Sequence, residues 1–185
     1  MGFVSGFEEI MREREPLAPQ TWFKLGGPAE YFAEPQTVDE LQALVLRCRD
    51  EEMQVRVLGG GSNLLIPDNG VSGLVLQLKA PAFTEVKVEK QNLTAGGGVK
   101  LGHLISAAVR EGLAGLEALV GIPGTVGGAL HGNSGGRGGD VGQWTSAVTV
   151  MTRSGEMFQR EREDLVFAYR QSSLNELAIL TAQFH

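Results

Sequence analysis

Residues 121–136 read GIPGTVGGALHGNSGG, and residues 59–63 read GGGSN. Glycine tolerates positive φ and allows close backbone approach, and successive N–H groups in such a turn form a concave site for an anion. Between Gly121 and Gly142, 10 of 22 residues are glycine, which is too many for a long helix or strand. Two glycine-rich loops in one short chain predict an extended anionic ligand that is gripped from both sides.

The loop GGGSN follows a short apolar run, Val55–Leu58. Taken alone, it is as typical of a tight turn or bulge as of a phosphate cradle. It lacks the Lys-Ser/Thr of a P-loop and the G-x-G-x-x-G spacing of a dinucleotide fold. The second loop favours a ligand, because Pro123 fixes one turn while Asn133 and Ser134 add short polar groups. A diphosphate-bridged cofactor fits this description, although these residues alone do not identify one.

The rest of the chain alternates between helical and extended patterns. Thr37-Val38-Asp39-Glu40 is a capping box, and the apolar residues behind it predict a helix at about 38–51. A second helix is expected at roughly 100–111, with Gly112 as its stop. Strands are predicted at 55–58, 73–78, 83–89, 146–152, 156–160 and 177–184, with a hairpin turn at Arg153-Ser154-Gly155. The pattern is that of an α+β fold.

The start of the chain carries a charged stretch, EEIMREREP, that ends at Pro16. We expect residues 1–20 to form a leader arm with one or two helical turns. The predicted organisation continues with a first subdomain over 21–80 and a second subdomain over 81–185.

Composition limits the classes of partner. The chain has 185 residues, of which 42% are hydrophobic, and this is enough to build a core. A net charge of −6 opposes nucleic-acid binding, and no block of Lys and Arg reverses it locally. No apolar run is long enough to cross a membrane, and residues 1–12 lack the features of a secretion signal, so we expect a cytoplasmic protein with no membrane partner. Cys48 is the only cysteine and lies on an apolar helical stripe, which predicts plain packing.

Five motifs carry a resemblance to a known family. They are TWFKLGGPAEYFAEP (21–35), VLGGGSNLL (57–65), GLEALVGIPGTVGG (115–128), NSG (133–135) and YRQS (169–172). In this order they resemble the UDP-N-acetylmuramate dehydrogenase family, also called UDP-N-acetylenolpyruvoylglucosamine reductase. The likeness runs from about Thr21 to Phe184. It implies the FAD-binding fold of the PCMH (vanillyl-alcohol-oxidase-like) class, built from two α+β subdomains, and a role in peptidoglycan precursor synthesis.

The resemblance implies that FAD is the cofactor. Some relatives in the wider fold class attach FAD covalently through a histidine in the first loop, where this chain has Ser62 and Asn63. We therefore expect noncovalent binding. The residues implied to contact FAD are Gly59, Gly60, Gly61, Ser62, Asn63, Ile122, Pro123, Gly124, Val126, Gly127, Gly128, Asn133, Gly135, Gly139, Asp140 and Val141.

The resemblance also implies a reaction in two halves. NADPH gives hydride to FAD, and reduced FAD gives hydride to the enolpyruvyl group of UDP-N-acetylglucosamine enolpyruvate, which yields UDP-N-acetylmuramate. Arg170 matches the catalytic arginine of the family's Y-R-x-S motif, implied to hold the substrate carboxylate and stabilise enolate charge. Without the resemblance, Arg170 would read as a surface arginine after a strand.

The family places its proton-donating serine and an acidic partner in a C-terminal substrate domain that is absent from this sequence. The chain is then expected to bind FAD with weak or no turnover, either as a fragment of a longer reductase or as a short flavin-binding protein. Two other classes stay open: a non-catalytic flavin-, nucleotide- or sugar-binding module, and a small flavin oxidase of the same fold. The oligomeric state is not predicted.

The histidines and tryptophans have ordinary interpretations. We expect His103 and His185 to be solvated, whereas His131 lies within the second glycine loop and can approach the flavin. No second histidine is spaced to form a metal site, so no metal is expected. Trp22 and Trp144 are more typical of packing than of flavin stacking.

Overall fold

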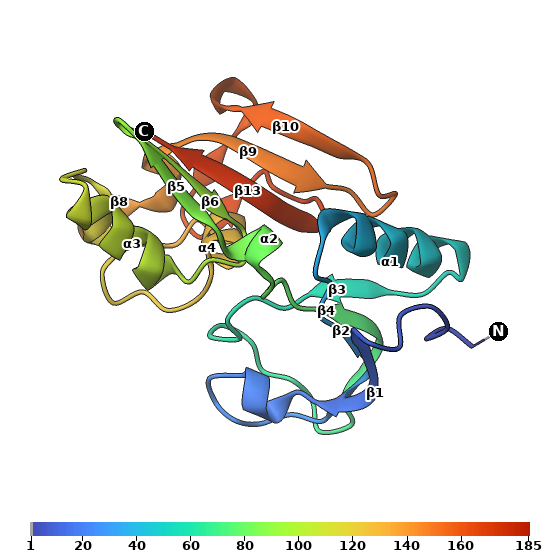
Figure 1. Ribbon diagram of the computed structural model, residues 1–185. Helices are drawn as coiled ribbons and strands as arrows, with labels where there is room; N and C mark the ends of the chain where they lie inside the picture. Colours follow the sequence, from blue (N-terminus) through green and yellow to red (C-terminus); the bar gives the residue numbers. More distant parts are fainter. Residues whose placement is uncertain (1) are drawn as a thin grey trace.

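In the computed structural model the strands form two main sheets (Figure 1). The strands of one sheet precede residue 80 in the sequence, and those of the other follow it. The structure describes residues 2–185. Residues 77–80 connect the last strand of the first sheet to the next helix, and the predicted division into subdomains at residues 80/81 stays a prediction. The α+β content expected from the sequence is confirmed.

The first sheet has four strands in the order β1-β2-β4-β3. They are β1 (Met11–Pro16), β2 (Pro28–Ala33), β3 (Val55–Val57) and β4 (Val71–Leu76). β2, β4 and β3 are parallel, and β1 pairs antiparallel with β2 at the edge. The carboxyl ends of the three parallel strands therefore meet at one edge of this sheet, where ligands of open parallel sheets commonly bind.

Helix α1 (Val38–Asp50) packs against this sheet and confirms the predicted first helix. The Thr37 hydroxyl caps it by accepting the Glu40 N–H at 3.1 Å. The Glu40 carboxylate accepts from Gln36 N–H at 2.7 Å, one residue before the cap, so the expected reciprocal bond of a capping box is shifted by one position. Cys48 lies fully buried on the inner face of α1, as predicted, and burial raises the pKa of its thiol to about 11.

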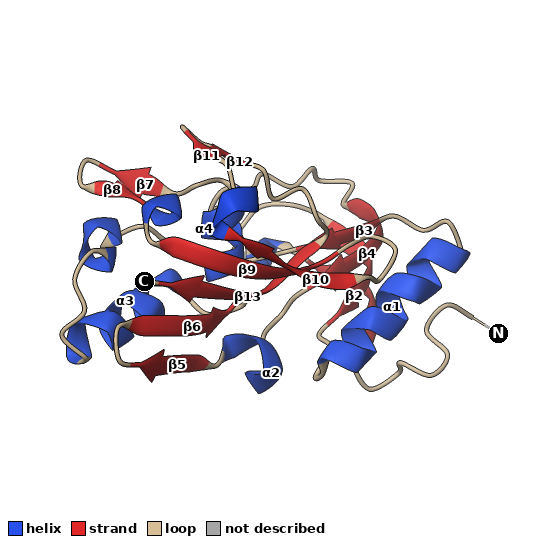
Figure 2. Ribbon diagram, turned by 90° about the horizontal axis from the view of Figure 1, so that it is seen from above, coloured by secondary structure: helices blue, strands red, loops and turns tan. Residues whose placement is uncertain are grey.

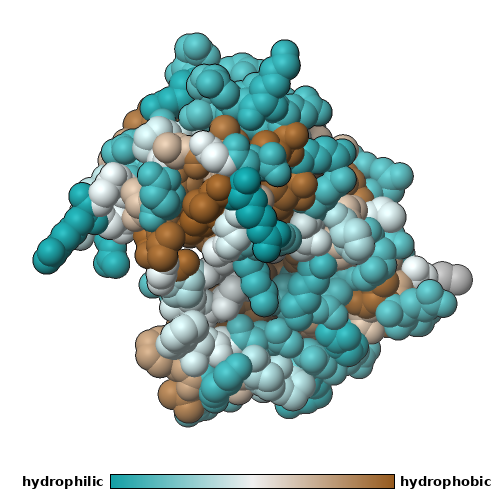
Figure 3. All heavy atoms as spheres, turned by 60° about the vertical axis from the view of Figure 1, so that its left-hand side comes forward, coloured by the Kyte–Doolittle hydropathy of each residue, from teal (hydrophilic) through white to brown (hydrophobic). Residues whose placement is uncertain are grey.

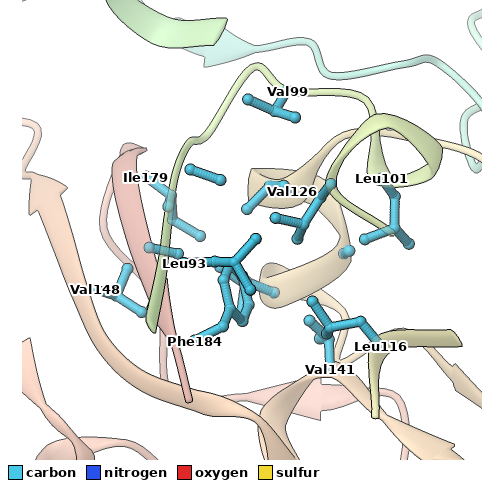
Figure 4. Close-up of a cluster of buried hydrophobic side chains, with 14 of the residues drawn as sticks. Leu93, Val99, Leu101, Leu116, Val126, Val141, Val148, Ile179 and Phe184 are labelled. Carbon is cyan, nitrogen blue, oxygen red and sulfur yellow. The ribbon is translucent and has the colours of Figure 1, made fainter. Parts of the chain in front are cut away.

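The second sheet has five antiparallel strands in the order β10-β9-β13-β6-β5 (Figure 2). They are β5 (Val86–Glu89), β6 (Asn92–Gly96), β9 (Thr145–Met151), β10 (Met157–Glu161) and β13 (Ala178–Phe184). Helices α3 (Leu101–Arg110) and α4 (Val126–His131) supply side chains such as Leu101 and Val126 to the core on this sheet (Figure 4). The remaining elements are short: α2 (Pro81–Thr84), the hairpins β7–β8 (Gly135–Gly136 and Gly139–Asp140) and β11–β12 (Phe167–Ala168 and Gln171–Ser172), and the 3-10 turns η1 (Ala18–Gln20), η2 (Leu116–Leu119), η3 (Val141–Gln143) and η4 (Arg162–Asp164).

The two sheets share one of the hydrophobic clusters. Leu44 of α1 and Leu76 of β4 belong to the same buried cluster as Met151 and Leu180 of the second sheet. The Gln42 side chain of α1 also donates to the Gly155 carbonyl in the β9–β10 turn at 2.8 Å. Because α1 packs against both sheets, this packing, and not a linker, fixes the separation of the two sheets.

The expectation for the start of the chain was largely wrong, although residues 18–20 do form one 3-10 turn. Residues 11–16 form a strand instead of helical turns, and their charged side chains are largely exposed because β1 is an edge strand. Phe3 and Leu17 bury their side chains in two different clusters and tie this segment to the protein. Pairing with β2 makes residues 11–16 extended, although the local sequence EEIMREREP favours helical turns. The strand β2 was not predicted from the sequence either.

The predicted strand at 83–89 was partly wrong. Pro81 stands in the first turn of α2, where its missing N–H costs nothing, and the extended segment begins only at Val86. The hairpin partner β6 was missed. Its sequence, NLTAG, is short and ends in the glycine run 96–98, so it lacks a clear alternating pattern.

Within residues 2–185, no helix combines the length and the apolar character that crossing a bilayer requires. The same residues bring no three His, Cys, Asp or Glu side chains together in a way that could hold a metal ion.

Candidate functional site

A cleft of about 950 Å³ lies between the ends of the two sheets. Leu58 and Lys79, which follow β3 and β4, line one wall, and the start of α4 and residues 174–179 line the other. This volume falls within the roughly 300–1,000 Å³ typical of small-molecule sites. Figure 3 shows the face on which the two parts of the molecule meet, with apolar side chains exposed around the recess.

The two glycine loops contact each other in the cleft. A Cβ atom added to Gly60 would lie 2.9 Å from the Gly124 Cα, and one added to Gly59 would lie 2.7 Å from the Thr125 hydroxyl oxygen. The Ser62 hydroxyl also donates weakly to the Pro123 carbonyl at 3.4 Å. Glycine at these positions thus serves contact between the loops as well as any contact with a ligand.

Unpaired backbone N–H groups are concentrated in the first loop. None of the N–H groups of Gly59–Asn63 finds an acceptor among residues 2–185. In the second loop, by contrast, the first N–H groups of α4 are already paired: Val126 donates to Val99 O at 2.8 Å, Gly127 donates to Gly97 O at 2.8 Å, and Gly128 donates to the Thr125 hydroxyl at 3.3 Å. The N–H groups of Gly121 and Gly124 have no acceptor among residues 2–185 either, so the amides available to an anion form a continuous run in the first loop and single positions before α4.

The cleft has a positive lining in an acidic protein. Its Lys and Arg residues are Arg56, Lys79, Lys100 and Arg153, and its one acidic residue among the described ones is Glu176. The chain as a whole carries a net charge of −6. A cleft that reverses the overall sign of charge favours an anionic ligand.

Lys79 is held at the cleft wall by an ion pair. Its ammonium lies 2.9 Å from Glu34, which also accepts from Arg12 at 2.9 Å. Burial raises the pKa of Glu34, but hydrogen bonds from Lys79 and Arg12 outweigh burial and hold that pKa below its usual value. Arg153 is fixed by donation to Val55 O at 3.0 Å. Lys100 forms no ion pair with any of residues 2–185.

The structure brings half of the predicted contact residues to the cleft. Those that line it are Gly59, Gly60, Ser62, Ile122, Pro123, Gly124, Gly127 and Gly128. Gly61 and Asn63 belong to the same loop without lining the cleft, and Gly61 backs onto Gln20, whose carbonyl oxygen would lie 2.1 Å from an added Cβ.

The other predicted contact residues lie elsewhere. The side chains of Val126 and Val141 are fully buried in the second core, and both are visible among the apolar side chains of Figure 4. Gly135, Gly139 and Asp140 form the β7–β8 hairpin outside the cleft lining. At sequence level these residues carried no signal to separate them from the cleft-lining glycines.

Asn133 is a structural bridge rather than part of the cleft wall. It is 5% exposed, donates through Nδ2 to Ala168 O at 2.9 Å and accepts through Oδ1 from Gly142 N–H at 3.1 Å. Both polar ends of its side chain are thus used inside the protein. Asn133 thereby connects the end of α4 to the β11–β12 hairpin.

Arg170 lies at the tip of this hairpin. Tyr169 and Arg170 form the turn between Ala168 and Gln171, and Arg170 adopts a positive φ of 57°, which is uncommon for a residue other than glycine. The Ser172 hydroxyl donates to His131 O at 2.9 Å and fixes the hairpin against α4. Arg170 is not among the cleft-lining residues, although Leu174, four positions further on, is.

Sequence reasoning missed several residues of the cleft. Gly97 and Gly98 follow β6 in a third glycine run, and Cβ atoms there would lie 1.9 Å from Ile179 O and 1.8 Å from Leu78 O. The glycine run at 96–98 was the sequence signal that could have predicted these cleft residues. Gln77 carried no such signal, and it lines the cleft although only 7% of its surface is exposed.

Comparison with known proteins identifies the family. The model of the FAD binding domain family matches residues 29–160. The chain belongs to the FAD binding domain family. Its expected α+β fold of the FAD-binding PCMH-type class, and its resemblance to the reductases, are thereby confirmed.

Relatives similar to the chain carry one name. The chain is 39% identical over 183 residues to a UDP-N-acetylenolpyruvoylglucosamine reductase of Rhodopirellula baltica, covering 99% of this chain and 60% of that protein. It is 43% identical over 171 residues to a protein of the same name from Prochlorococcus marinus, covering 91% of this chain and 56% of the relative. The chain thus spans little more than half the length of these curated relatives.

Solved structures agree with this placement. The crystal structure of UDP-N-acetylenolpyruvylglucosamine reductase from Thermus caldophilus superimposes with a TM-score of 0.78 at 36% identity, covering 95% of this chain and 61% of that chain. A 6-hydroxy-D-nicotine oxidase from Arthrobacter nicotinovorans superimposes with a TM-score of 0.66 over 98% of this chain and 40% of its own. Its identity is 20%, so this likeness shows the fold alone.

The residues present fit an FAD molecule. The unpaired N–H groups of Gly59–Asn63 suit a diphosphate, and the excess of Lys and Arg in the lining suits its charge. Gly128 leaves bare backbone at the cleft, since the only atom near an added Cβ would be the Thr125 hydroxyl oxygen at 3.5 Å. The cleft therefore combines the polar and steric features that a dinucleotide requires.

Proposed function

We propose that this chain is the FAD-binding part of an NADPH-dependent reductase that converts UDP-N-acetylglucosamine enolpyruvate to UDP-N-acetylmuramate in peptidoglycan precursor synthesis. The observation that carries the proposal is the cleft in which both glycine loops meet a set of Lys and Arg side chains. The name shared by relatives that match nearly the whole chain supports the choice of substrate. The proposed location is the cytoplasm.

Within this proposal FAD is bound without a covalent link. The N–H groups of Gly59–Asn63 donate to the diphosphate, and Lys100 and Arg153 supply further positive charge at the cleft. The contact residues predicted from the sequence that line the cleft are the proposed set, and Asn133, whose side chain is used inside the protein, is proposed as a support for the neighbouring hairpin. When bound, FAD supplies the hydride chemistry that links NADPH to the enolpyruvyl double bond.

Arg170 is the proposed catalytic residue. Its strained turn places a guanidinium at a protruding hairpin tip, and Ser172 and Asn133 fix that hairpin to the end of α4. A planar guanidinium can bind a carboxylate through two hydrogen bonds and offset charge that develops beside it. We assign it to the carboxylate of the enolpyruvyl substrate.

We expect the chain by itself to bind FAD and to show little or no turnover. An oxidase function has only likeness of fold at 20% identity behind it, as for the nicotine oxidase. A non-catalytic flavin- or nucleotide-binding module differs from the main proposal in its failure to use NADPH and the enolpyruvyl substrate.

The decisive experiment is a visible absorbance spectrum of the purified chain, before and after addition of FAD, followed by acid precipitation. A flavin spectrum whose chromophore leaves with the supernatant is expected. A colourless protein that takes up no FAD would overturn the proposal. Oxidation of NADPH that depends on the enolpyruvyl substrate, measured in the same preparation, would contradict the expected low turnover and leave FAD binding intact.

A further inference from the structure

Gln77 combines burial with an unpaired acceptor at the wall of the cleft. It follows β4, is 7% exposed, and lines the cleft. Its Nε2 donates to Gly59 O at 3.2 Å. Its Oε1 is buried and has no hydrogen-bond partner among residues 2–185.

The orientation of this side-chain amide is fixed by its one bond. Gly59 O is a carbonyl oxygen and can only accept, so the amide atom that faces it must be the NH₂ group. Rotating the amide would bring two acceptors together. The atom left without a partner is therefore an acceptor, and it requires a donor.

Packing alone does not explain a glutamine at this position. Gln77 N–H donates to Ala33 O at 3.0 Å and continues the β4 pairing, so its side chain follows Val75 on the same face of the sheet. Val75 belongs to an apolar cluster with Leu58 and Ile66. An apolar side chain would extend that cluster without leaving a buried acceptor unpaired, which is costly.

We propose that Gln77 Oε1 accepts a hydrogen bond from a sugar hydroxyl that flanks the diphosphate of the bound dinucleotide. Gln77 is joined through Nε2 to Gly59, the first residue of the loop whose N–H groups are unpaired, so its side-chain amide lies next to that set of donors. A ligand that places phosphate oxygens on those donors presents its nearest hydroxyl groups to Gln77. In a flavin dinucleotide these belong to the ribose on one side and the ribityl chain on the other. The inference rests on the proposed function.

The test compares Gln77→Met with a matched control. Methionine keeps the length of the side chain and removes both polar atoms. We expect FAD to bind about tenfold more weakly to Gln77→Met by calorimetric titration. We also expect the melting temperature of the FAD-free variant to change little, because removal of an unpaired buried acceptor offsets the loss of the hydrogen bond to Gly59 O.

Gln42→Met is the control, because Gln42 Nε2 donates to a glycine carbonyl, Gly155 O, in the same manner but outside the cleft. It should lower the melting temperature and leave FAD affinity unchanged. Displacement of FAD by ADP and by FMN then separates the two sugars. Loss of affinity for ADP alone points to the ribose, and loss for FMN alone points to the ribityl chain.

Three outcomes count against the inference. Unchanged FAD affinity in Gln77→Met would overturn it. Equal losses for ADP and FMN, together with a lower melting temperature, would also overturn it, since Gln77 would then act by holding the first loop through Gly59. Failure of the unaltered chain to bind FAD would remove the proposed function first, and the assignment of Gln77 with it.

Discussion

The loop at 59–63 and the segment at 121–142 are both rich in glycine, but the structure uses glycine differently in each. Gly61 is pressed against the Gln20 carbonyl, and the N–H groups around it have no protein acceptor within residues 2–185. Gly121 has nothing within 4 Å of an added Cβ, and the N–H groups of Gly127 and Gly128 are paired. Because Gly121 and Gly124 keep unpaired N–H groups, the second segment offers an anion single amides, whereas the first loop offers a continuous run of them.

The largest contrast is expected between alanine substitutions in the two regions. Gly61→Ala combines a positive φ of 62° with a Cβ placed 2.1 Å from Gln20 O, and we expect a loss of about 4 kcal/mol in the free energy of unfolding. Gly121→Ala has a φ of 87° but open space, and we expect a loss of about 1–2 kcal/mol. Urea denaturation of both variants measures the difference. Equal losses would mean that φ strain accounts for both, and that the close contact with the Gln20 carbonyl adds nothing.

Asn133→Ala tests the structural role of the second segment. The change leaves the Ala168 carbonyl and the Gly142 N–H without their side-chain partner, and we expect a loss of about 2–4 kcal/mol in the free energy of unfolding. Ser134→Ala is the matched neighbour, because the Ser134 side chain makes no hydrogen bond with any of residues 2–185, and it should change stability little. A drop in FAD affinity at unchanged stability would make Asn133 a ligand contact and reverse this assignment.

The fold was predictable where local patterns and tertiary structure agree. Thr37 caps α1 as its sequence indicates, and Gly155 turns the β9–β10 hairpin with a φ of 81°. The β1–β2 pair was missed because β1 is a charged edge strand whose extended form depends on its partner rather than on its own sequence. Local propensity has no information about such a partner.

The site was predictable only as far as glycine marks it. Val126 stands between cleft-lining residues in the sequence, yet its side chain points into the core on the second sheet. One face of helix α4 is turned to the cleft and another to this core. Gln77 and Arg153 lie far from either glycine loop in the sequence and reach the cleft through the arrangement of the sheets. No motif could have identified them.

Gly128→Ala separates the two reasons for a glycine in the second segment. The added Cβ would make an ordinary 3.5 Å contact with the Thr125 hydroxyl, and alanine in a helix should raise the free energy of unfolding by about 0.5–1 kcal/mol. The methyl group also occupies the cleft, so we expect FAD binding to weaken by about 1–2 kcal/mol. Thermal unfolding and FAD titration measure the two effects. Higher stability with unchanged affinity would show that the ligand does not approach Gly128, and the first loop alone would carry the site.

Lys100→Met gives the smallest expected effect and tests the charge on the second wall. Lys100 lines the cleft and forms no ion pair within the described residues, so its charge is available to a ligand. We expect FAD affinity to fall about threefold at low ionic strength and the difference to shrink as salt is added, because partly exposed charges are screened. Lys90→Met removes an exposed lysine outside the cleft and should leave affinity unchanged. If both variants lose affinity equally, the overall charge of the protein governs binding and the cleft lining does not. If Lys100→Met alone loses affinity and does so independently of salt, Lys100 makes a desolvated contact with the ligand, and the second segment contributes more than its paired amides indicate.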